Sequence, residues 1–218
     1  MDVIERNVAT TTHGRFLMAR PSASDAAPLL VGFHGYAEAA ETQLARLRAI
    51  PSADQWVVVS IQGLHRFYQR RADEVIASWM TRQDRELAIA DNLAYVSAVI
   101  EDVMRERPAP YVVFAGFSQG VAMAFRAAAA CTRPVAGAIA AGGDVPPELD
   151  AASLARVGSA LVCRGVRDEW YSTAKFDADL RRLREADVRV QQLEFEGGHE
   201  WSDEAVGAAG AFLRDLRA

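Results

Sequence analysis

Lysine is almost absent from this chain of 218 residues: Lys175 is the only one, every other basic residue is arginine, and we attach no function to this bias. Acidic residues outnumber basic ones, 29 to 24, and the formal charge of −5 leaves no basic footprint for nucleic acid. The longest apolar runs have the length of a strand, well short of the ~20 residues of a membrane helix. Met1 to Arg20 lacks the apolar core of a secretory signal, so we expect a soluble, cytoplasmic protein.

Cysteine and histidine are also scarce. Cys131 and Cys163 lie in different predicted elements, and two cysteines make neither a disulfide framework nor a metal centre. Cysteine is among the residue types most often fully buried, so we expect two buried free thiols. The four histidines show no ligand spacing, and we therefore expect no metal site.

Apolar, β-branched runs alternate with helical patterns, which favours an α/β fold with a mostly parallel sheet and helices on both faces. Val3 to Ala9 and Arg15 to Ala19 predict an N-terminal antiparallel hairpin. Six later runs bring the total to about eight strands: Pro28 to Phe33, Trp56 to Ile61, Tyr111 to Ala115, Val135 to Ala141, Ala160 to Arg164 and Val188 to Phe195. Helical patterns cover Ala39 to Ile50, Arg85 to Arg107, Gln119 to Ala130, Thr173 to Ala186 and Asp203 to Leu216. No linker or repeat divides the chain, so residues 1–218 are expected to form a single domain.

The pentapeptide Gly116-Phe117-Ser118-Gln119-Gly120 ends the strand pattern at Tyr111 to Ala115 and opens a helical pattern. In that context Gly-x-Ser-x-Gly predicts a nucleophile elbow, a sharp turn that holds the serine hydroxyl clear of the sheet. The two glycines let the chain bend where a Cβ would collide with the neighbouring strand or helix. Ser118 is therefore the candidate nucleophile.

A serine hydroxyl needs a general base, and the base needs an orienting acid. On this type of fold the chain order is Ser, then Asp or Glu, then His, and His199 is the only histidine after Ser118. Asp168 follows the predicted strand at Ala160 to Arg164, at the sheet edge where open α/β sheets gather their sites. Asp144 after the preceding strand and Glu169 beside Asp168 remain alternatives for the acid.

The developing oxyanion needs preformed donors, and backbone N–H groups serve well because they need little reorganisation. We expect one from Gln119, the residue after the nucleophile, and one from Tyr36, in the loop after Pro28 to Phe33. His34 is expected to brace that loop, and Glu38 to belong to its solvated end.

The stretch from Gly63 to Gln83 is the largest segment without clear periodicity, and long loops in compact domains often shape a site. Tyr68 and Trp79 within it, together with Trp170, are candidate pocket residues. The alternative for Trp79 is that it anchors the loop to the core. Whether the stretch acts as a lid is left open.

These residues resemble the α/β-hydrolase superfamily and, within it, the phospholipase/carboxylesterase group that includes acyl-protein thioesterases. The similarity rests on His34-Gly35, the Gly-Phe-Ser-Gln-Gly elbow, Gly165 to Asp168 and Gly198-His199, in the family's order and spacing. It implies a three-layer fold without a large cap domain, a triad of Ser118, Asp168 and His199, main-chain donors at Tyr36 and Gln119, and ester hydrolysis without a cofactor. The chain departs from the family at Tyr36-Ala37-Glu38, where members usually carry a Leu-Gly-Asp-like run, and at Val121, where they carry a second glycine.

The expected reaction is hydrolysis of small-molecule carboxylic esters through an acyl-enzyme on Ser118. A chain this close to the minimal hydrolase core has little room for a cap, which favours short-chain or flexible acyl groups. Acyl thioesters and lysophospholipids are alternative substrates, amides are a third, and a slow or non-catalytic ligand-binding protein is the alternative of another class. We expect a monomer or a weak homodimer.

Overall fold

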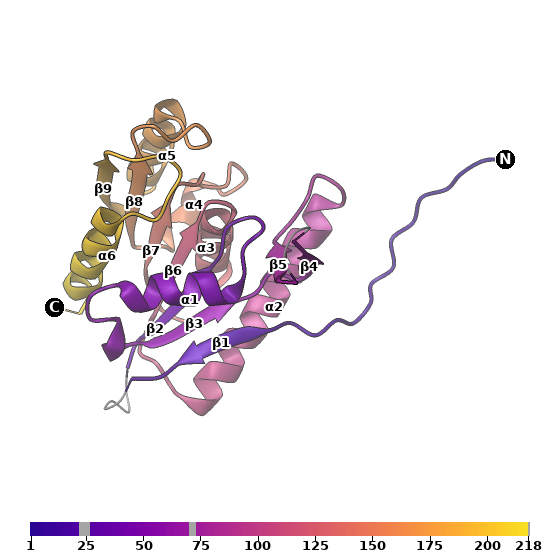
Figure 1. Cartoon of the computed structure of the whole chain (residues 1–218), viewed down its shortest axis with the longest axis horizontal. Helices are drawn as coiled ribbons and strands as arrows, with labels where there is room; N and C mark the ends of the chain where they lie inside the picture. Colours follow the sequence, from indigo (N-terminus) through magenta and orange to yellow (C-terminus); the bar gives the residue numbers. More distant parts are fainter. Residues whose placement is uncertain (22–26, 70–72, 218) are drawn as a thin grey trace.

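The structure is a computed structural model, and it describes residues 1–21, 27–69 and 73–217. Seven strands form its central sheet: β1 (Phe16–Ala19), β2 (Leu29–Phe33), β3 (Val57–Ile61), β6 (Val112–Phe117), β7 (Val135–Ala141), β8 (Ser159–Gly165) and β9 (Arg189–Phe195). Their order across the sheet is β1-β3-β2-β6-β7-β8-β9 (Figure 1). All neighbours pair in parallel except β1, which runs antiparallel to β3. The mostly parallel sheet that the sequence predicts is confirmed.

Helices cover both faces of this sheet and give the fold three layers. One face packs against α1 (Ala40–Ala49) and α6 (Asp203–Asp215), and the other against α2 (Arg85–Glu106), α3 (Gln119–Ala130) and α5 (Thr173–Glu185). Successive residues of a strand point to opposite faces. In β6, accordingly, Val112 and Phe114 join one core cluster and Val113 and Ala115 join the other. The sequence did not predict the short elements η1 (Ala53–Gln55) and α4 (Ala151–Ala155).

The N-terminal part of the prediction needs correction. The expected antiparallel strand is present as β1, but its partner is β3, with Phe16 opposite Ile61. Val3 to Ala9 forms no strand, and its residues are exposed. Its apolar residues are interrupted by Glu5, Arg6 and Asn7, so it offers no continuous face to bury, and Figure 1 shows it leading away from the body.

The stretch from Gly63 to Gln83, read from sequence as irregular, contains two short strands, β4 (His65–Tyr68) and β5 (Val75–Ser78). They pair antiparallel and form a separate two-stranded sheet. Ala77 of β5 exchanges main-chain hydrogen bonds with the loop after β2, accepting from the Ala37 N–H and donating to the Glu38 carbonyl. The hairpin therefore supports the loop from which an oxyanion donor is expected.

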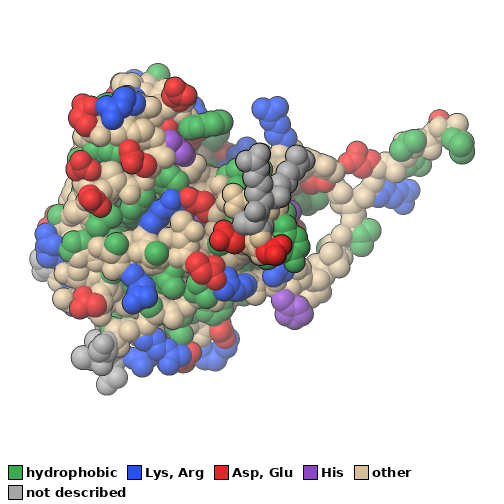
Figure 2. All heavy atoms as spheres, in the orientation of Figure 1, with side chains coloured by type: hydrophobic (Ala, Val, Ile, Leu, Met, Phe, Trp, Pro, Cys, Tyr) green, Lys and Arg blue, Asp and Glu red, His purple; other side chains and the backbone are tan. Residues whose placement is uncertain are grey.

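Charge is distributed without a large patch of one sign on the face that carries α1, where acidic and basic side chains are interspersed (Figure 2). Within the described ranges, no helix combines the length and apolarity needed to cross a membrane.

Candidate active site

The parallel strands deliver their carboxyl ends to one edge of the sheet, and the candidate residues follow four of them. The loop beginning at His34 comes after β2, Ser118 directly follows β6, Asp168 lies three residues beyond β8, and His199 lies four residues beyond β9. This is the edge at which open α/β sheets place their ligands.

Ser118 sits in a sharp turn between β6 and α3. Its backbone has φ of 51° and ψ of −119°, a region that a residue with a Cβ rarely adopts. The turn fits because its glycines have no side chain: a Cβ on Gly116 would lie 2.3 Å from the Gly120 carbonyl oxygen, and one on Gly120 would lie 2.1 Å from that of Phe33. The sharp turn predicted from the pentapeptide is therefore present, and its backbone at Ser118 is strained.

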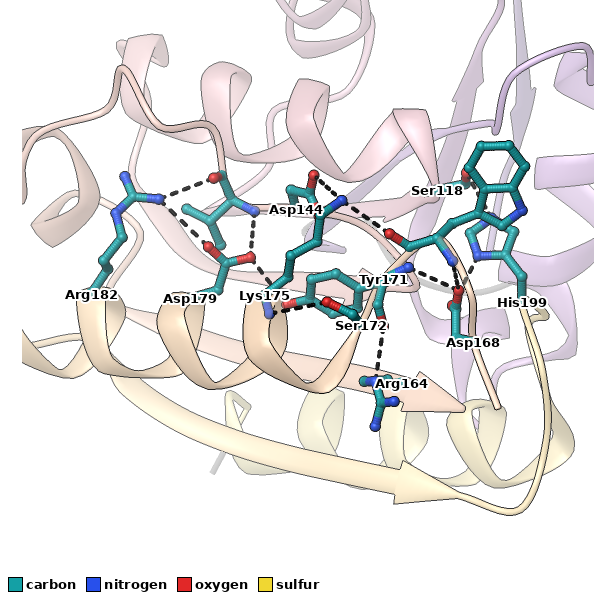
Figure 3. Close-up of polar contacts among 12 residues, drawn as sticks. Ser118, Asp144, Arg164, Asp168, Tyr171, Ser172, Lys175, Asp179, Arg182 and His199 are labelled. Atoms are coloured by element: carbon teal, nitrogen blue, oxygen red, sulfur yellow. Dashed lines mark hydrogen bonds and ion pairs between the residues drawn. The ribbon is translucent and has the colours of Figure 1, made fainter. Parts of the chain in front are cut away.

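His199 lies between Ser118 and Asp168 (Figure 3). Its Nε2 is 2.8 Å from the Ser118 Oγ, and its Nδ1 is 2.8 Å from the Asp168 Oδ2. A carboxylate only accepts, so the Nδ1–H donates to Asp168, and Nε2 is left to accept from the serine hydroxyl. This is the spacing and the tautomer that a serine nucleophile with its base requires.

The second oxygen of the Asp168 carboxylate, Oδ1, is also hydrogen-bonded and fixes the orientation of the side chain. Oδ1 accepts hydrogen bonds from the main-chain N–H groups of Trp170 at 2.8 Å and Tyr171 at 2.9 Å. The side chain is only 1% exposed, so the orientation of Oδ2 toward His199 is fixed in a buried site. The two alternative acids lie elsewhere: Glu169 is exposed, and Asp144 pairs with Lys175 at 3.1 Å.

The turn that presents Asp168 is fastened to its surroundings by buried polar groups (Figure 3). Arg164 donates through Nε to the Tyr171 carbonyl at 2.8 Å. The Tyr171 hydroxyl donates to Asp179 of α5 at 3.1 Å, and Asp179 also accepts from the Val145 N–H at 2.9 Å. Burial raises the pKa of Asp179, an effect that these hydrogen bonds oppose.

His34 braces the loop after β2, the role expected of it. Its Nε2 accepts from the Gly63 N–H at 3.0 Å, so Nδ1 carries the proton and donates to the Gly35 carbonyl at 2.7 Å. The imidazole is fully buried, and burial lowers its pKa against a smaller opposing effect of the Gly35 hydrogen bond. Trp79 packs beside it, with ring centres 5.0 Å apart, and donates to the His34 carbonyl at 2.8 Å.

Glu38 differs from its expected place at a solvated loop end. Its Oε2 accepts from the Gly35 N–H at 2.7 Å, and its two oxygens receive both terminal nitrogens of Arg46, at 2.6 and 2.7 Å. Burial would raise the pKa of this carboxyl, but Arg46 and the Gly35 amide outweigh it and hold the pKa below its usual value. The Arg46 guanidinium also lies 4.2 Å from the centre of the Phe117 ring, which packs against His199.

Sequence reasoning missed this assembly. The available signal was an acid three residues after Gly35, at the place of the family's usual aspartate, followed by Arg46 in the next helix. A single acid in a loop is usually solvated. Only the arrangement of α1 against the loop brings the two charges together.

Of the two expected oxyanion donors, Gln119 belongs to the elbow itself and Tyr36 to the loop after β2. Gln119 begins α3, and its side chain is tied down, accepting from the Trp79 N–H at 2.9 Å and donating to the Met80 carbonyl at 2.9 Å. Tyr36 is 61% exposed, with its ring 6.1 Å from that of Phe67. Neither main-chain N–H donates a hydrogen bond to another described residue, so both remain free for an acceptor.

A cavity of about 450 Å³ opens beside Ser118 and His199. Of the three candidate pocket residues, only Trp170 lines it, with 76% of its surface exposed. Trp79 is fully buried in the core, and Tyr68 lies exposed on β4, so neither reaches the cavity. The part of the chain that the structure describes holds no cluster of three or more histidine, cysteine or carboxylate side chains that would suit a metal ion.

A sheet that brings a serine, a carboxylate and an imidazole to one edge in this chain order defines an α/β hydrolase. The family follows from the sequence: a family model described as phospholipase/carboxylesterase matches residues 21–216. The chain belongs to that family and is a carboxylesterase-type hydrolase. No curated protein matches it.

Solved structures agree with this fold at low sequence identity. A Bacillus cereus carboxylesterase superposes with a TM-score of 0.71 at 17% identity, with 93% of this chain and 94% of that chain covered. A Zea mays acyl-protein thioesterase 2 also gives 0.71, at 15% identity and with 94% and 100% covered. A phospholipase/carboxylesterase from Dyadobacter fermentans gives 0.69, at 19% identity and with 95% and 100% covered. At these identities the likeness concerns the fold.

Proposed function

We propose that this hydrolase cleaves carboxylic esters in two steps, through an acyl-enzyme on Ser118. The observation that carries the proposal is the continuous path from the buried Asp168 through His199 to the Ser118 hydroxyl, with both contacts at 2.8 Å. A hydroxyl is a weak nucleophile until a base in hydrogen-bond contact removes its proton.

In the first step His199 Nε2 takes the Ser118 proton as Oγ attacks the ester carbonyl. The tetrahedral intermediate places negative charge on the former carbonyl oxygen, and the free N–H groups of Tyr36 and Gln119 are the proposed donors to it. As the intermediate collapses, the carbon–oxygen bond to the alcohol breaks, and His199 returns the proton to the departing oxygen. Asp168 stabilises the imidazolium that exists between these events.

In the second step His199 takes a proton from water, and the resulting hydroxide equivalent attacks the acyl carbonyl. The same two N–H groups serve the second oxyanion. The acid departs when the bond to Ser118 Oγ breaks, and His199 gives its proton back to the serine. The enzyme returns to its starting state.

We expect the volume of the cavity to limit the length of the acyl group. Its volume of about 450 Å³ lies toward the small end of ligand sites, which supports short-chain or flexible acyl esters as substrates. The turnover of 4-nitrophenyl esters from two to sixteen carbons measures this directly. A maximum at the longest chains would favour the alternative substrates, which are lysophospholipids and acyl thioesters, the latter in line with the acyl-protein thioesterase among the neighbours.

The acyl-enzyme is tested with a fluorophosphonate probe on the folded protein, with the adduct mapped by mass spectrometry. Labelling at Ser118, and its loss in the Ser118→Ala variant, are expected. Labelling of a different residue, or none at all, would exclude the mechanism. Ligand-induced thermal stabilisation without hydrolysis of any ester would support a binding protein on this fold, and matched ester and amide substrates would reveal amide cleavage.

We further propose that the chain acts as one domain in the cytoplasm, as a monomer or a weak homodimer. Both core clusters join residues from the two halves of the sequence, which supports a single folding unit. The two cysteines are buried free thiols, which suits a reducing compartment. Sedimentation over a range of concentrations measures the oligomeric state.

A further inference from the structure

The wall of the catalytic cavity carries an excess of positive charge. Its lining includes three cationic side chains, Arg82, Arg85 and Lys175, and a single carboxylate, that of Asp144. The whole chain has the opposite balance, with 29 acidic and 24 basic residues. The charge of the cavity wall is therefore opposite in sign to the net charge of the molecule.

Lys175 and Asp144 largely neutralise each other. The ammonium is 3.1 Å from the carboxylate and also donates to the Trp170 carbonyl at 3.0 Å (Figure 3). Both partners are about half exposed and form one side of the cavity. The positive charge that remains belongs to the two arginines.

Arg85 lies close enough to Arg126 and Glu148 for its charge to act on both. The Glu148 carboxylate is already engaged, since it accepts from Nε of Arg126 at 2.7 Å. Arg126 is a buried cation that needs this partner. One carboxylate thus faces two guanidinium groups, and the group exposed to the cavity, that of Arg85, keeps its positive charge in excess.

Arg82 precedes Arg85 by three residues, and both are exposed. Arg82 forms no ion pair with any residue that the structure describes. A guanidinium group presents a planar fork of donors that matches carboxylate and phosphate oxygens. Two such groups beside a serine nucleophile are suited to hold an anion attached to the bound ester.

We propose that the cavity selects esters that carry an additional anionic group, a carboxylate or a phosphate, bound by Arg82 and Arg85 while the ester carbonyl lies at Ser118. This inference rests on the proposed function and specifies its substrate class. It assigns to the two arginines a role in specificity, since they contact the substrate away from the reacting atoms. The same charge also attracts anionic esters into the cavity, an effect that salt screens.

The test compares matched ester pairs that differ in charge. On the acyl side, 4-nitrophenyl hydrogen adipate and 4-nitrophenyl 5-phosphonopentanoate are compared with neutral 4-nitrophenyl methyl adipate, which shares their leaving group. On the alcohol side, 4-acetoxybenzoate is compared with its methyl ester, each rate being divided by its hydroxide-catalysed rate. We expect a kcat/KM about fivefold to tenfold higher for the anionic member of at least one pair, the size that two partly exposed ion pairs allow. The two anionic acyl probes distinguish a carboxylate from a phosphate preference.

The doubly substituted variant R82E/R85E should bring the anionic-to-neutral ratio of kcat/KM to one or below. The matched control is the double variant R105E/R214E, which makes the same total charge change on exposed side chains of α2 and α6 that do not line the cavity. It should leave the ratio unchanged. Raising the salt concentration should reduce the preference of the unmodified protein and have no such effect on R82E/R85E.

Binding supplies a readout that does not depend on turnover. The Ser118→Ala variant, with and without R82E/R85E, is titrated with anionic 4-nitrophenyl hydrogen adipate and with neutral 4-nitrophenyl methyl adipate. We expect the anionic ester to bind more tightly than the neutral one, and this difference in affinity to be lost when the two arginines are replaced. Equal rates and equal binding within every pair would overturn the inference and leave the proposed function standing, whereas preferential binding without hydrolysis of any probe would overturn the proposed function alone.

Discussion

The carboxylate of Glu38 accepts a hydrogen bond from the main-chain N–H of Gly35, and the two atoms are 2.7 Å apart. This contact fixes the loop that follows β2 one residue before Tyr36, whose own N–H is a proposed oxyanion donor. Because Arg46 holds both oxygens of the same carboxylate, we expect the donor's position to depend on an ion pair whose two residues do not line the cavity beside Ser118.

Replacing Glu38 with Gln should therefore lower kcat by about tenfold with a smaller change in KM, since a misplaced donor weakens transition-state binding more than substrate binding. Steady-state kinetics on a neutral ester measure the split. The matched control is Glu41→Gln, which disrupts an exposed ion pair with Arg15 nearby and should change the unfolding free energy by less than about 1 kcal/mol. Equal effects of the two substitutions on kcat would contradict a role for Glu38 in positioning the loop.

Burial of His34 should make stability depend on pH below neutrality. The folded pKa is lowered from 6.5, so between the folded value and 6.5 the unfolded chain binds a proton that the native state does not. Stability should then fall as the pH drops through 6.5, by at most about 1.4 kcal/mol per pH unit, and should level off above that value. Urea unfolding between pH 5 and 8, compared with the His34→Gln variant, isolates this contribution. An identical pH slope in both proteins would exclude it.

The strained backbone of Ser118 predicts an unusual ranking of two inactive variants. Ser118→Gly and Ser118→Ala should both reduce kcat by several orders of magnitude, because each removes the nucleophile. Glycine adopts φ near 51° without the clash of a Cβ, so Ser118→Gly should be more stable than Ser118→Ala by about 1 kcal/mol. Thermal unfolding ranks them. An alanine variant of equal or greater stability would show that the turn stores no strain at this residue.

The identity of the acid is tested by three amide substitutions. Asp168→Asn keeps an oxygen for the Trp170 and Tyr171 amides but cannot hold the His199 Nδ1–H, so kcat should fall by roughly 10³-fold to 10⁴-fold. Asp144→Asn and Glu169→Gln should each change kcat by less than about tenfold, since the carboxylate that accepts from His199 Nδ1 is that of Asp168. Single-turnover acylation rates report the effect directly. A larger loss in either of the latter two would reassign the acid.

The sequence predicted best where local pattern and chemistry coincide. The boundaries predicted from apolar periodicity, for the strands of the central sheet and for the predicted helices that cover it, agree with the structure within about two residues. The approach of Ser118, Asp168 and His199 could be anticipated because parallel strands bring their carboxyl ends to one edge. That argument needs only chain order.

Prediction from the sequence failed where the direction of a side chain decides whether a residue reaches the site. Trp79 and Tyr68 belong to one segment, yet Trp79 turns into the core beside His34 and Tyr68 faces solvent. Tyr68 pairs with Val75 in the β4–β5 sheet, whereas Trp79 follows β5 and is held by hydrogen bonds to Gln119 and to the His34 carbonyl. No periodicity in the sequence reveals these contacts. The Glu38–Arg46 pair eluded prediction for a similar reason, since it depends on the way α1 packs against the loop rather than on spacing.

The position of the single lysine has a practical use. The only lysine of the chain, Lys175, lines the cavity beside Ser118, and its ammonium donates to the main-chain carbonyl of Trp170. Apart from the amino terminus, an amine-reactive dye has no other place to attach. Once the amino terminus is blocked, a single fluorophore can therefore be installed at the cavity wall without mutagenesis, where its emission would report occupancy by a ligand in real time.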